Sequence, residues 1–427
     1  MAADWRAMTD RIVRAVLEAA DPAAAVTRSW RADLLPGGPV VLIAYGKASV
    51  AMASAAMALL GDRIVEGVVI GVPSHVDAFD AGGLPVRAIA ADHPLPTERN
   101  VLAAAEVEGV ANSLPAGASV LALISGGASA QLTAPAPGLT LRDMRDTTDA
   151  MLRAGATIGE LNAVRKHCDR LKGGGLAAML APAPVVGLVV SDVMGDRLDL
   201  VSSGPTAPDT STFADALDAI AGRGAPVPAS VLEHLGAGAR GDRPETPKPR
   251  DPAFDHVTHR VIANNAISVG SLAAMLERDG YHVESKTGVE GEAAEVGGAL
   301  GRAVRDARPG SALVWGGETT VRVGAASGMG GRNQELALAA ARTIEGDRDA
   351  FVCSIGTDGV DGPTDAAGGA VTNRTASELL VAGVDLDDAL ERHDSHRALD
   401  AVGRLIRTGP TGTNVNDVMV GLRPALE

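Results

Sequence analysis

Apolar runs that end in glycine, serine or aspartate alternate with alanine-rich helical patterns along the first half of the chain. The clearest runs occupy residues 40–46, 68–75, 120–129 and 185–196. Continuous apolar strands followed by helices are typical of a parallel sheet that helices cover on both faces. In such sheets, ligands bind beyond the carboxyl ends of the strands. The pattern therefore predicts an α/β fold and directs attention to the turns that follow these runs.

The chain is long enough for two domains. It has 427 residues, of which 46% are hydrophobic, and chains of this length usually divide. Residues 236–254 concentrate glycine, proline and charge, which is typical of a linker. We therefore expect an N-terminal Rossmann-like α/β domain over residues 1–235 and a C-terminal α/β domain over residues 255–427.

The net charge limits the class of partner. The formal net charge is −15 and the sequence pI is about 5.1. Such a field repels phosphate backbones and anionic lipids, which argues against general binding to nucleic acid or to membranes. Aromatic residues make up only 2% of the chain, so platforms for stacking bases are scarce. A site for a small anion must therefore be locally positive.

Targeting patterns are not evident in the sequence. The first twenty residues contain acids and a helical pattern rather than a signal peptide. No stretch reaches the roughly 18 uninterrupted apolar residues of a transmembrane helix. Cys168 and Cys353 are the only cysteines, and they give no disulfide framework, as is usual in a reducing cytosol. We expect a cytoplasmic protein.

The run GMGGRNQELAL, residues 328–338, combines glycines, a basic residue and a helix start. The backbone N–H groups of Gly330, Gly331 and Asn333 could surround an anion at the helix N-terminus. The guanidinium fork of Arg332 also suits phosphate or carboxylate. The run predicts a small, negatively charged, phosphorylated ligand.

Two turns at predicted strand ends add to this picture. Lys47 follows a strand and precedes a helix, where its charge could act on a transferring phosphoryl group. The turn SGGAS, residues 125–129, could wrap phosphate with backbone N–H groups. The alternatives are a solvated lysine and glycines that serve packing alone. Neither turn matches a Walker A loop or a nucleophile elbow.

A basic segment lies in LNAVRKHCDRLKGGGL, residues 161–176. In so acidic a chain this concentration of positive charge stands out, and Arg165 and Lys166 are the candidates for a substrate carboxylate or phosphate. Basic residues near a helix C-terminus also complement the helix dipole without any ligand, and Gly173 is a good helix stop. The segment contains Arg165, Lys166, His167, Arg170 and Lys172.

Acidic residues at strand ends are candidates for metal binding and proton transfer. Mg²⁺ commonly binds one or two carboxylates together with phosphate oxygens, and a carboxylate could take a proton from a substrate hydroxyl. Turn chemistry is the alternative, because Asp-Gly pairs favour turns. Glu318 could be a site acid or a turn residue, and the HxxH pair is more typical of a solvated helix than of a metal site. The residues are Asp192, Asp196, Asp358, Asp361 and Asp365, with His393 and His396.

These segments together resemble the bacterial and archaeal glycerate 2-kinase family, whose C-terminal unit is the MOFRL domain. The resemblance covers nearly the whole chain and implies two domains with the active site in the cleft between them. One departure is Ala128, where many relatives have a third glycine; alanine would be strained there if the position requires a positive φ. The matching stretches are YGKAS, DHPLP, SGGASA, LNAVRKHCDRLKGGGLA, SDVMGD, SSGPT, GGETTV, GMGGRNQELAL and GTDGVDGPTDAAG.

The resemblance implies an enzyme that uses ATP and Mg²⁺ to phosphorylate the 2-hydroxyl of D-glycerate. It implies that Lys47 and Arg332 are essential and that Asp358 takes part. Our hypothesis assigns Mg²⁺ to Asp192, with Asp361 as a further ligand, and assigns the γ-phosphoryl group to Lys47 and Arg332. Asp358 then orients or deprotonates the hydroxyl. Phosphate contacts are assigned to Gly126, Gly127, Ser129, Gly330, Gly331 and Asn333, and substrate contacts to Arg165, Lys166 and Ser125.

Two other functions remain as alternatives. An NAD(P)H-dependent hydroxypyruvate reductase, a name also given to relatives, would need a dinucleotide fingerprint, and no G-x-G-x-x-G stands between a strand and a helix. A non-catalytic sensor of a phosphorylated metabolite would use the same cations but would not need several acids. The residues alone do not choose between 2- and 3-phosphoglycerate, and they leave the oligomeric state open, a homodimer included.

Overall fold

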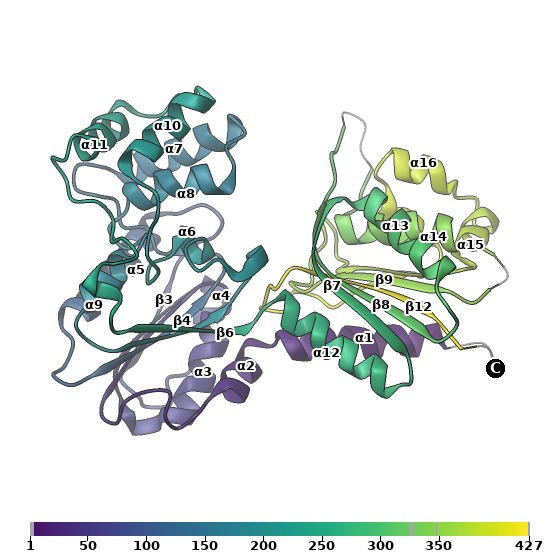
Figure 1. Cartoon of the computed structure of the whole chain (residues 1–427), viewed down its shortest axis with the longest axis horizontal. Coiled ribbons are helices and arrows are strands. Elements are labelled where there is room, and N and C mark those ends of the chain that lie inside the picture. The colour runs from purple at the N-terminus through teal and green to yellow at the C-terminus, as the bar shows by residue number, and fades with distance from the viewer. Residues whose placement is uncertain (1–3, 325–327, 347, 426–427) are drawn as a thin grey trace. The chain divides into compact units, whose positions relative to one another are not determined.

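The computed structural model describes residues 4–324, 328–346 and 348–425. Its contacts divide the chain into two compact units. The inserted unit is Pro22–Ile262, and the split unit combines Met1–Asp21 with Ala263–Glu427. Figure 1 follows the chain through both units, which are described here one at a time.

The inserted unit is built on a six-stranded sheet in the order β3-β2-β1-β4-β5-β6. The β1–β2, β2–β3, β1–β4 and β4–β5 pairs are all parallel, which confirms the expected parallel sheet. This is the strand order of the Rossmann fold. The strands are added toward one edge of the sheet from β1 to β3 and toward the other edge from β4 onward, so the strand order reverses between β1 and β4. The strands are β1 (Val40–Tyr45), β2 (Ile64–Gly71), β3 (Val86–Ala90), β4 (Ser119–Ser125), β5 (Val185–Val190) and β6 (Val257–Ala263).

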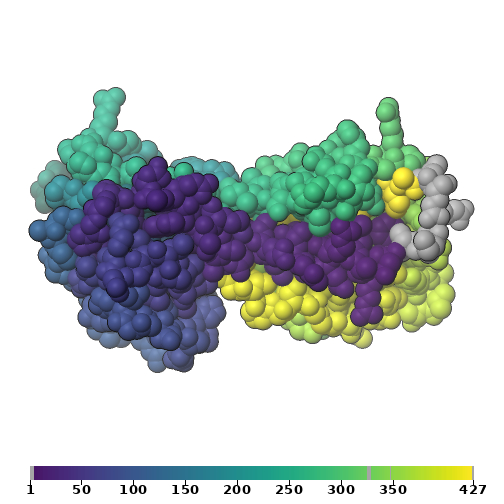
Figure 2. Space-filling model, turned by 90° about the horizontal axis from the view of Figure 1, so that it is seen from below, coloured from purple at the N-terminus to yellow at the C-terminus, as the bar shows by residue number. Residues whose placement is uncertain are grey.

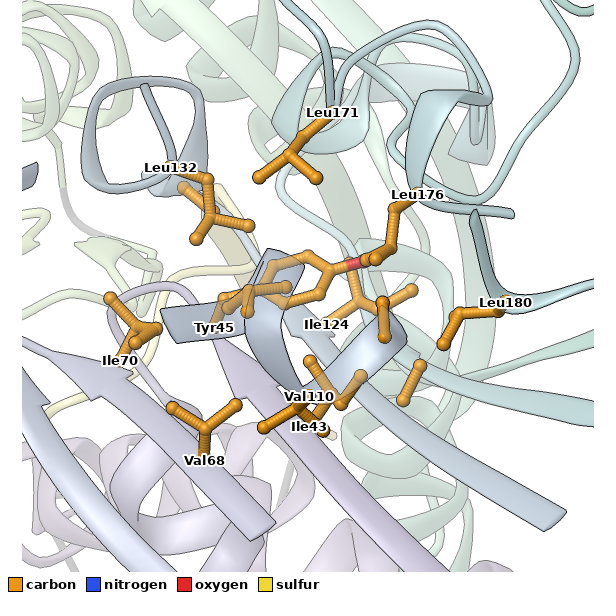
Figure 3. Close-up of a cluster of buried hydrophobic side chains, with 14 of the residues drawn as sticks. Ile43, Tyr45, Val68, Ile70, Val110, Ile124, Leu132, Leu171, Leu176 and Leu180 are labelled. Atoms are coloured by element: carbon orange, nitrogen blue, oxygen red, sulfur yellow. The ribbon is translucent and has the colours of Figure 1, made fainter. Parts of the chain in front are cut away.

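Helices cover both faces of this sheet, as the continuous apolar runs predict. α3 (Ser49–Leu60) packs against β1, β2 and β4, and α5 (Glu98–Asn112) and α9 (Gly175–Leu180) cover the other face (Figure 1). Figure 3 shows the core under α5 and α9, where the Tyr45 ring lies among Ile124, Leu132 and Leu171. The remaining short elements are α2 (Pro22–Ser29), η1 (Gly61–Arg63), α4 (Pro73–Val76), α6 (Ala128–Gln131), η2 (Met194–Asp196), η3 (Val201–Ser203) and η4 (Pro252–Phe254).

Four more helices of the inserted unit form a separate cluster with its own small core. They are α7 (Leu141–Arg153), α8 (Ile158–His167), α10 (Phe213–Arg223) and α11 (Ala229–Ala239). Capping boxes begin α7, α8 and α10, each with a threonine whose side chain accepts from the backbone three residues on. These local signals fix the helix starts and hold the basic segment in α8.

The split unit contains a six-stranded mixed sheet in the order β11-β10-β9-β12-β8-β7. Only the β7–β8 pair is parallel; the other four pairs are antiparallel. The strands are β7 (His282–Glu292), β8 (Ser311–Thr320), β9 (Phe351–Gly356), β10 (Gly368–Thr372), β11 (Leu405–Ile406) and β12 (Asp417–Arg423). The expected C-terminal α/β unit is thus present.

Alternate residues of the split unit's strands enter two different cores. Val418, Val420 and Leu422 of β12 pack with α1 (Trp5–Ala20) and α12 (Asn265–Arg278), whereas Met419 packs with α13 (Ala293–Asp306) and α14 (Arg332–Ile344). This is the period of two expected for a strand with both faces buried. The smaller helices are α15 (Thr375–Val381), α16 (Leu386–Glu391) and α17 (Ser395–Ala401).

The first helix lies in a different unit from the one expected. α1 packs on α12 and β9, and Figure 2 shows the N-terminal residues, in purple, against green and yellow segments from late in the chain. The reason is an apolar face, with Ile12 and Val16 fully buried, that completes the core of the mixed sheet. The boundary expected after residue 235 also differs from the division at residues 262 and 263.

The segment expected to be a linker, 236–254, packs on the inserted unit. Its first residues finish α11, and Glu245 accepts from His167 Nε2 at 3.0 Å and from the backbone of Phe213 at 3.0 Å. Thr246 donates to Asp209 at 2.9 Å. Polar composition alone suggested a linker, but these side chains bond to the helical cluster. Among the described residues, no helix combines the length and apolar character needed to span a membrane.

Candidate functional site

The carboxyl ends of β1 and β4 are neighbours at the point where the strand order reverses. Their registers pair Tyr45 with Ile124, so the turn at residues 45–47 and the turn at residues 125–129 leave the sheet side by side. Ligands of open α/β sheets bind in the crevice at this point. The structure therefore brings two of the predicted turns to the place where the fold most often holds a ligand.

Hydrogen bonds join the segment at residues 45–48 to the segment at residues 125–131. The backbone N–H of Lys47 donates to Gly126 O at 2.9 Å, and that of Ala48 donates to Ser125 Oγ at 3.0 Å. The N–H of Gly46 donates to Gln131 Oε1 at 3.0 Å. Because Ser125 is buried and its hydroxyl serves the neighbouring turn, its role here is structural rather than in substrate binding.

The two glycines after Ser125 allow charged side chains to come very close to the backbone. A Cβ atom on Gly126 would lie 1.8 Å from Asp192 Oδ2, and one on Gly127 would lie 2.9 Å from Lys47 Cγ. Asp192 and Lys47 therefore pack directly on consecutive glycines. A cation, a carboxylate and a glycine turn converge, which is the combination expected for a phosphoryl site.

The backbone amides of this turn are open. Gly127 adopts a left-handed conformation, with φ +91°, and Ala128 is the first residue of α6. Ala128 is therefore not strained, because the positive φ falls on Gly127. Within the described residues, the amides of Gly127 and Ala128 have no hydrogen-bond acceptor. They are available to an anion.

The Lys47 ammonium has no ion-pair partner within the described residues, although its side chain is half-buried. His93 lies beside it, since a Cβ on Gly127 would be 3.3 Å from His93 Cδ2. Desolvation and the charge of Lys47 lower the pKa of His93 to about 4, so the imidazole is neutral at physiological pH. The residues assigned from the sequence did not include His93. The DHPLP motif, which contains it, is the feature of the sequence that could have pointed to this residue.

The loop that carries His93 is fixed by one buried asparagine. Asn100 Nδ2 donates to Asp92 O and to Ala130 O, both at 2.8 Å, and its Oδ1 accepts from the N–H of Thr97 at 2.9 Å. Asn100 also completes the capping box of α5. This bonding connects the loop to the segment that follows the serine-glycine turn.

The two basic candidates of α8 have different environments. Lys166 is buried and forms ion pairs with Asp209 at 3.2 Å and Asp199 at 3.6 Å, so its charge is already neutralised. Arg165 has no hydrogen bond or ion pair from its side chain within the described residues. Burial lowers the pKa of its guanidinium. Of the pair, Arg165 is the one that still needs an anion.

Ser129 belongs to a chain of polar groups. Its hydroxyl lies 2.8 Å from Ser203 Oγ, which donates to Asn162 Oδ1 at 2.9 Å. Ser202 donates to Ser125 O at 2.8 Å, and both Ser202 and Ser203 have a positive φ. Strained residues of this kind concentrate at functional sites. The SSGPT motif marked this segment, but nothing in the sequence indicated its contact with Ser129.

The glycine turn before α14 is filled by the protein itself. Asp361 Oδ1 accepts from the N–H of Asn333 at 3.0 Å, and Oδ2 accepts from the N–H of Gln334 at 2.9 Å and from Gln334 Nε2 at 2.9 Å. A Cβ on Gly331 would lie 2.3 Å from Asp361 Cγ. Asp361 therefore occupies the amides that the sequence suggested for phosphate. We withdraw Asn333 and Gly331 as phosphate contacts and Asp361 as a metal ligand.

Arg332 stands next to this filled turn and is held by two carboxylates. Its Nε and Nη2 donate to Asp417 at 2.7 and 3.0 Å, and its Nη1 lies 2.9 Å from Glu318 Oε1. Burial opposes the charge, but the hydrogen bonds and charge of Asp417 outweigh it and raise the pKa of Arg332. Burial raises the pKa of Asp417 to about 6, against the opposing effect of Arg332. Sequence reasoning missed Asp417, which lies 85 residues from Arg332.

Arg332 and Asp358 both line a cavity of about 460 Å³ in the split unit. Asp358 is partly exposed, and its Oδ1 accepts from the N–H of Val360 at 3.2 Å. Gly330 also borders the cavity, but a Cβ there would lie 2.2 Å from Ser395 Oγ, so packing alone explains that glycine. The cavity brings together a cation and an acid that sequence reasoning had selected separately.

The two histidines of the HxxH pair each contact a carboxylate. His393 Nδ1 lies 2.9 Å from Glu335, and His396 Nε2 lies 2.8 Å from Asp365. Among the described residues there is no group of three or more histidine, cysteine or acidic side chains that could hold a metal ion. Mg²⁺ bound mainly by phosphate oxygens needs only one or two carboxylates. Asp192, packed on the open glycine turn, fits that requirement.

Comparison with known sequences gives two family matches. Residues 8–236 match DUF4147, described as a domain of unknown function, and residues 311–417 match the MOFRL family. A protein of Pyrococcus horikoshii named glycerate 2-kinase is 38% identical over 99% of this chain and 98% of its own length. D-glycerate 2-kinase of Thermotoga maritima is 40% identical over 90% of both chains. A putative hydroxypyruvate reductase of Agrobacterium vitis is 38% identical over 97% of this chain and 93% of its own.

Solved structures give the same result. The crystal structure of glycerate kinase from Thermotoga maritima matches with a TM-score of 0.88 at 38% sequence identity, covering 98% of this chain and all of the other. A Pyrococcus horikoshii protein matches with a TM-score of 0.87 at 37% identity, covering both chains completely. The chain therefore belongs to the glycerate kinase family, with a DUF4147 region followed by a MOFRL region.

Proposed function

We propose that this protein transfers the γ-phosphoryl group of ATP to the 2-hydroxyl of D-glycerate, giving 2-phosphoglycerate and ADP. The observation that carries the proposal is the convergence of Lys47, Asp192 and an open glycine turn at the carboxyl ends of β1 and β4. Phosphoryl transfer depends mainly on positioning and on neutralising charge. These groups supply a fixed cation, free backbone N–H donors and a carboxylate for a metal.

The phosphate end of the reaction is assigned to the open turn. The N–H groups of Gly127 and Ala128 bind phosphate oxygens, and the Lys47 ammonium neutralises charge on the transferring group. Asp192 would hold Mg²⁺, which would supply further neutralisation of the phosphates. The neutral imidazole next to Lys47 adds no competing charge.

Binding of the glycerate substrate is assigned to Arg165 and Asp358. Arg165 binds the glycerate carboxylate, since it is the partly buried cation of α8 whose side chain has no hydrogen bond or ion pair among the described residues. Asp358 orients the 2-hydroxyl and accepts its proton as the hydroxyl oxygen bonds to phosphorus and the bond from phosphorus to the leaving ADP oxygen breaks. Lys166 is left out of this role because Asp209 and Asp199 neutralise it.

Arg332 is proposed to stabilise charge on the transferring group. Asp417 accepts hydrogen bonds from Nε and Nη2 of Arg332 and so fixes the orientation of the guanidinium. Arginine has five N–H donors. The three described contacts leave two donors for a phosphate oxygen. Glu318 is the partner that a phosphate would displace most easily, because it is 45% exposed whereas Asp417 is fully buried.

One incubation tests the proposal. The full-length protein is incubated with ATP, Mg²⁺ and D-glycerate, and the product is identified by NMR. The expected result is 2-phosphoglycerate together with an equal amount of ADP. Formation of 3-phosphoglycerate would refute the assigned regiochemistry, and the absence of any phosphorylated acid would refute the kinase function.

A parallel reaction addresses the name given to the Agrobacterium vitis relative. Hydroxypyruvate with NADH or NADPH is followed by absorbance. We expect no oxidation of either cofactor, since the turn after β1 is YGKAS rather than a glycine-rich dinucleotide fingerprint. Oxidation that depends on hydroxypyruvate would favour the reductase.

A further inference from the structure

His93 lies at the open turn, and the proposed function gives its ring no part in binding. A Cβ atom on Gly127 would lie 3.3 Å from His93 Cδ2 and 2.9 Å from Lys47 Cγ. The imidazole and the lysine side chain therefore pack on the same glycine, whose N–H has no acceptor within the described residues. His93 is exposed, so a ligand can reach its ring. A phosphate that binds this turn would have His93 beside it.

The ring of His93 brings one of its two nitrogens close to the turn. Cδ2 is the ring atom nearest to the Cβ position of Gly127, and Nε2 is bonded to Cδ2 whereas Nδ1 is not. Neither nitrogen has a hydrogen-bond partner within the described residues. A neutral imidazole carries one N–H donor, which can occupy either nitrogen. With the proton on Nε2, the ring presents an unused donor to the turn.

The loop that carries His93 is held by both backbone polar groups of Asp92. The Oδ1 atom of the buried Asn100 accepts from the N–H of Asp92 at 3.1 Å, and its Nδ2 donates to Asp92 O at 2.8 Å. The same Nδ2 donates to Ala130 O at 2.8 Å, in α6. One side chain therefore ties the backbone next to His93 to the helix that follows the open turn. A donor fixed in this way needs no rearrangement when charge develops on a reacting group.

The surroundings of His93 favour a hydrogen-bond donor over a general base. General bases act best when their pKa lies near the working pH. Desolvation and the neighbouring charge of Lys47 lower the pKa of His93 to about 4, so the ring is a weak base and is neutral near pH 7. Neutral imidazoles act as hydrogen-bond donors to developing negative charge in other active sites. Lys47 already supplies the positive charge at this turn.

We propose that His93 donates a hydrogen bond from Nε2 to the phosphoryl group that Lys47 neutralises, and so acts as an uncharged phosphate-binding residue. The inference rests on the proposed function for the identity of that group, but contact between His93 and a phosphate is a separate claim. Lys47 provides charge, and the amides of Gly127 and Ala128 provide fixed donors. His93 adds a donor from a third segment of the chain.

Nitrogen NMR of the full-length protein tests this contact without any turnover. The histidines are isotope-labelled, and the His93 ring signals are identified as those missing in His93→Gln. The probe is the β,γ-imido analogue of ATP with Mg²⁺, and ADP with Mg²⁺ is the comparison. We expect the analogue to shift the Nε2 signal of His93 and ADP, which lacks the transferring group, to shift it less. Unchanged signals at saturating analogue, or an equal shift with ADP, would overturn the inference.

Kinetics of His93 variants distinguish a donor from a base and from a packing residue. His93→Ala is expected to lower kcat by about a hundredfold, the usual cost of one donor to developing charge, with little change in the KM for D-glycerate. The neutral amide of His93→Gln also donates a hydrogen bond, so this variant should recover about tenfold of that loss. His256→Gln, which changes an exposed histidine just before β6, is the matched control and should alter neither quantity. Equal losses in His93→Ala and His93→Gln, both folded by circular dichroism, would overturn the donor role.

The inference and the proposed function fail in different ways. If the analogue or inorganic phosphate shifts the His93 signals but the wild-type protein phosphorylates no acid, the contact stands and the proposed function fails. If the wild-type protein phosphorylates D-glycerate and His93→Ala keeps its kcat, the kinase stands and the role of His93 is overturned.

Discussion

Two glycine turns each lie next to a basic residue and a helix start, yet they differ in what fills them. In the turn after β4, the amides of Gly127 and Ala128 are open and Lys47 has no partner within the described residues. In the turn before α14, the equivalent amides donate to the Asp361 carboxylate. One turn is an available anion site, and the other is a helix N-terminus that the protein caps with its own anion.

This difference shows why a glycine-rich run identifies a turn but not its ligand. The glycines of the open turn make room for Lys47 and Asp192, the side chains to which the proposed function assigns phosphate and metal binding. Gly331 in the filled turn makes room for Asp361, which serves stability. The comparison therefore predicts that changes to the open turn reduce turnover, whereas changes to the filled turn reduce folding stability.

Lys47 should give the largest effect. Lys47→Ala is expected to lower kcat by roughly a thousandfold, because a fixed charge on the phosphoryl group is lost, with little change in Tm. Steady-state kinetics and thermal unfolding measure the two quantities. Lys286→Ala removes an exposed lysine that lies over Trp315 and is the control. A kcat within threefold of wild type for Lys47→Ala would remove the open turn from the chemistry.

Arg332 should combine both kinds of effect. Arg332→Ala is expected to lower kcat by roughly a hundredfold or more and also to destabilise the fold, since Asp417 would remain buried without its partner. The double variant Arg332→Ala/Asp417→Asn removes that buried charge, so it should recover stability but not turnover. Recovery of both would make Arg332 a structural residue.

Asp361 tests the filled turn. Asp361→Ala leaves the N-terminal amides of α14 and the Gln334 side chain without their acceptor, at a cost of about 2–4 kcal/mol in the free energy of unfolding. Chemical denaturation measures this loss. The Mg²⁺ dependence of the remaining activity should be unchanged. A shifted Mg²⁺ requirement with normal stability would restore Asp361 as a metal ligand.

Glycine substitutions compare the two turns directly. Gly127→Ala places a side chain at a left-handed position against Lys47, so kcat is expected to fall by about tenfold, with a loss of roughly 1–2 kcal/mol in stability. Gly331→Ala should affect mainly stability, because its φ of −149° is extended and its new Cβ would meet Asp361. If kcat fell by the same factor for each kcal/mol of lost stability in both variants, the two turns would not differ in function.

The smallest effect concerns pH. The pKa of Asp417 is raised to about 6, so its carboxyl becomes protonated as the pH falls through 6 and its hold on Arg332 weakens. We expect kcat/KM to be about half its plateau value at pH 6 if that ionisation controls the orientation of Arg332. A full pH profile measures this, and Asp417→Asn should lose the acid limb. An identical limb in Asp417→Asn would assign it to another group.

The sequence was informative about the sheet and its turns because these depend on local order. Continuous apolar runs predicted β1, β4 and β5, and the residues that follow these runs lie at the carboxyl ends of the strands, as expected. The partners of Arg332 and of the α14 amides could not be predicted. Asp417 and Asp361 are distant along the chain, and an acid at a strand end has the same local pattern whether it caps a helix, holds an arginine or binds a metal.

The same limit explains the first helix and the segment before β6. The apolar stripe of α1 indicates that one face is buried but does not say against which sheet. The polar composition of residues 236–254 suggested a linker, while Glu245 and Thr246 find partners on the helical cluster. The composition of a segment indicates whether it has a face to bury. It does not indicate which part of the fold that face packs against, because the partner lies far away along the chain.

The position of α1 has a consequence for how the chain is made. Synthesis delivers α1 first and the rest of its unit only after residue 262. The inserted unit is therefore complete on the ribosome while Ile12 and Val16 still lack the sheet that will bury them. An apolar helix face must remain exposed, or be shielded by a chaperone, through some 240 residues of elongation. Because its two parts are separated in the sequence, the split unit completes its fold after the inserted unit.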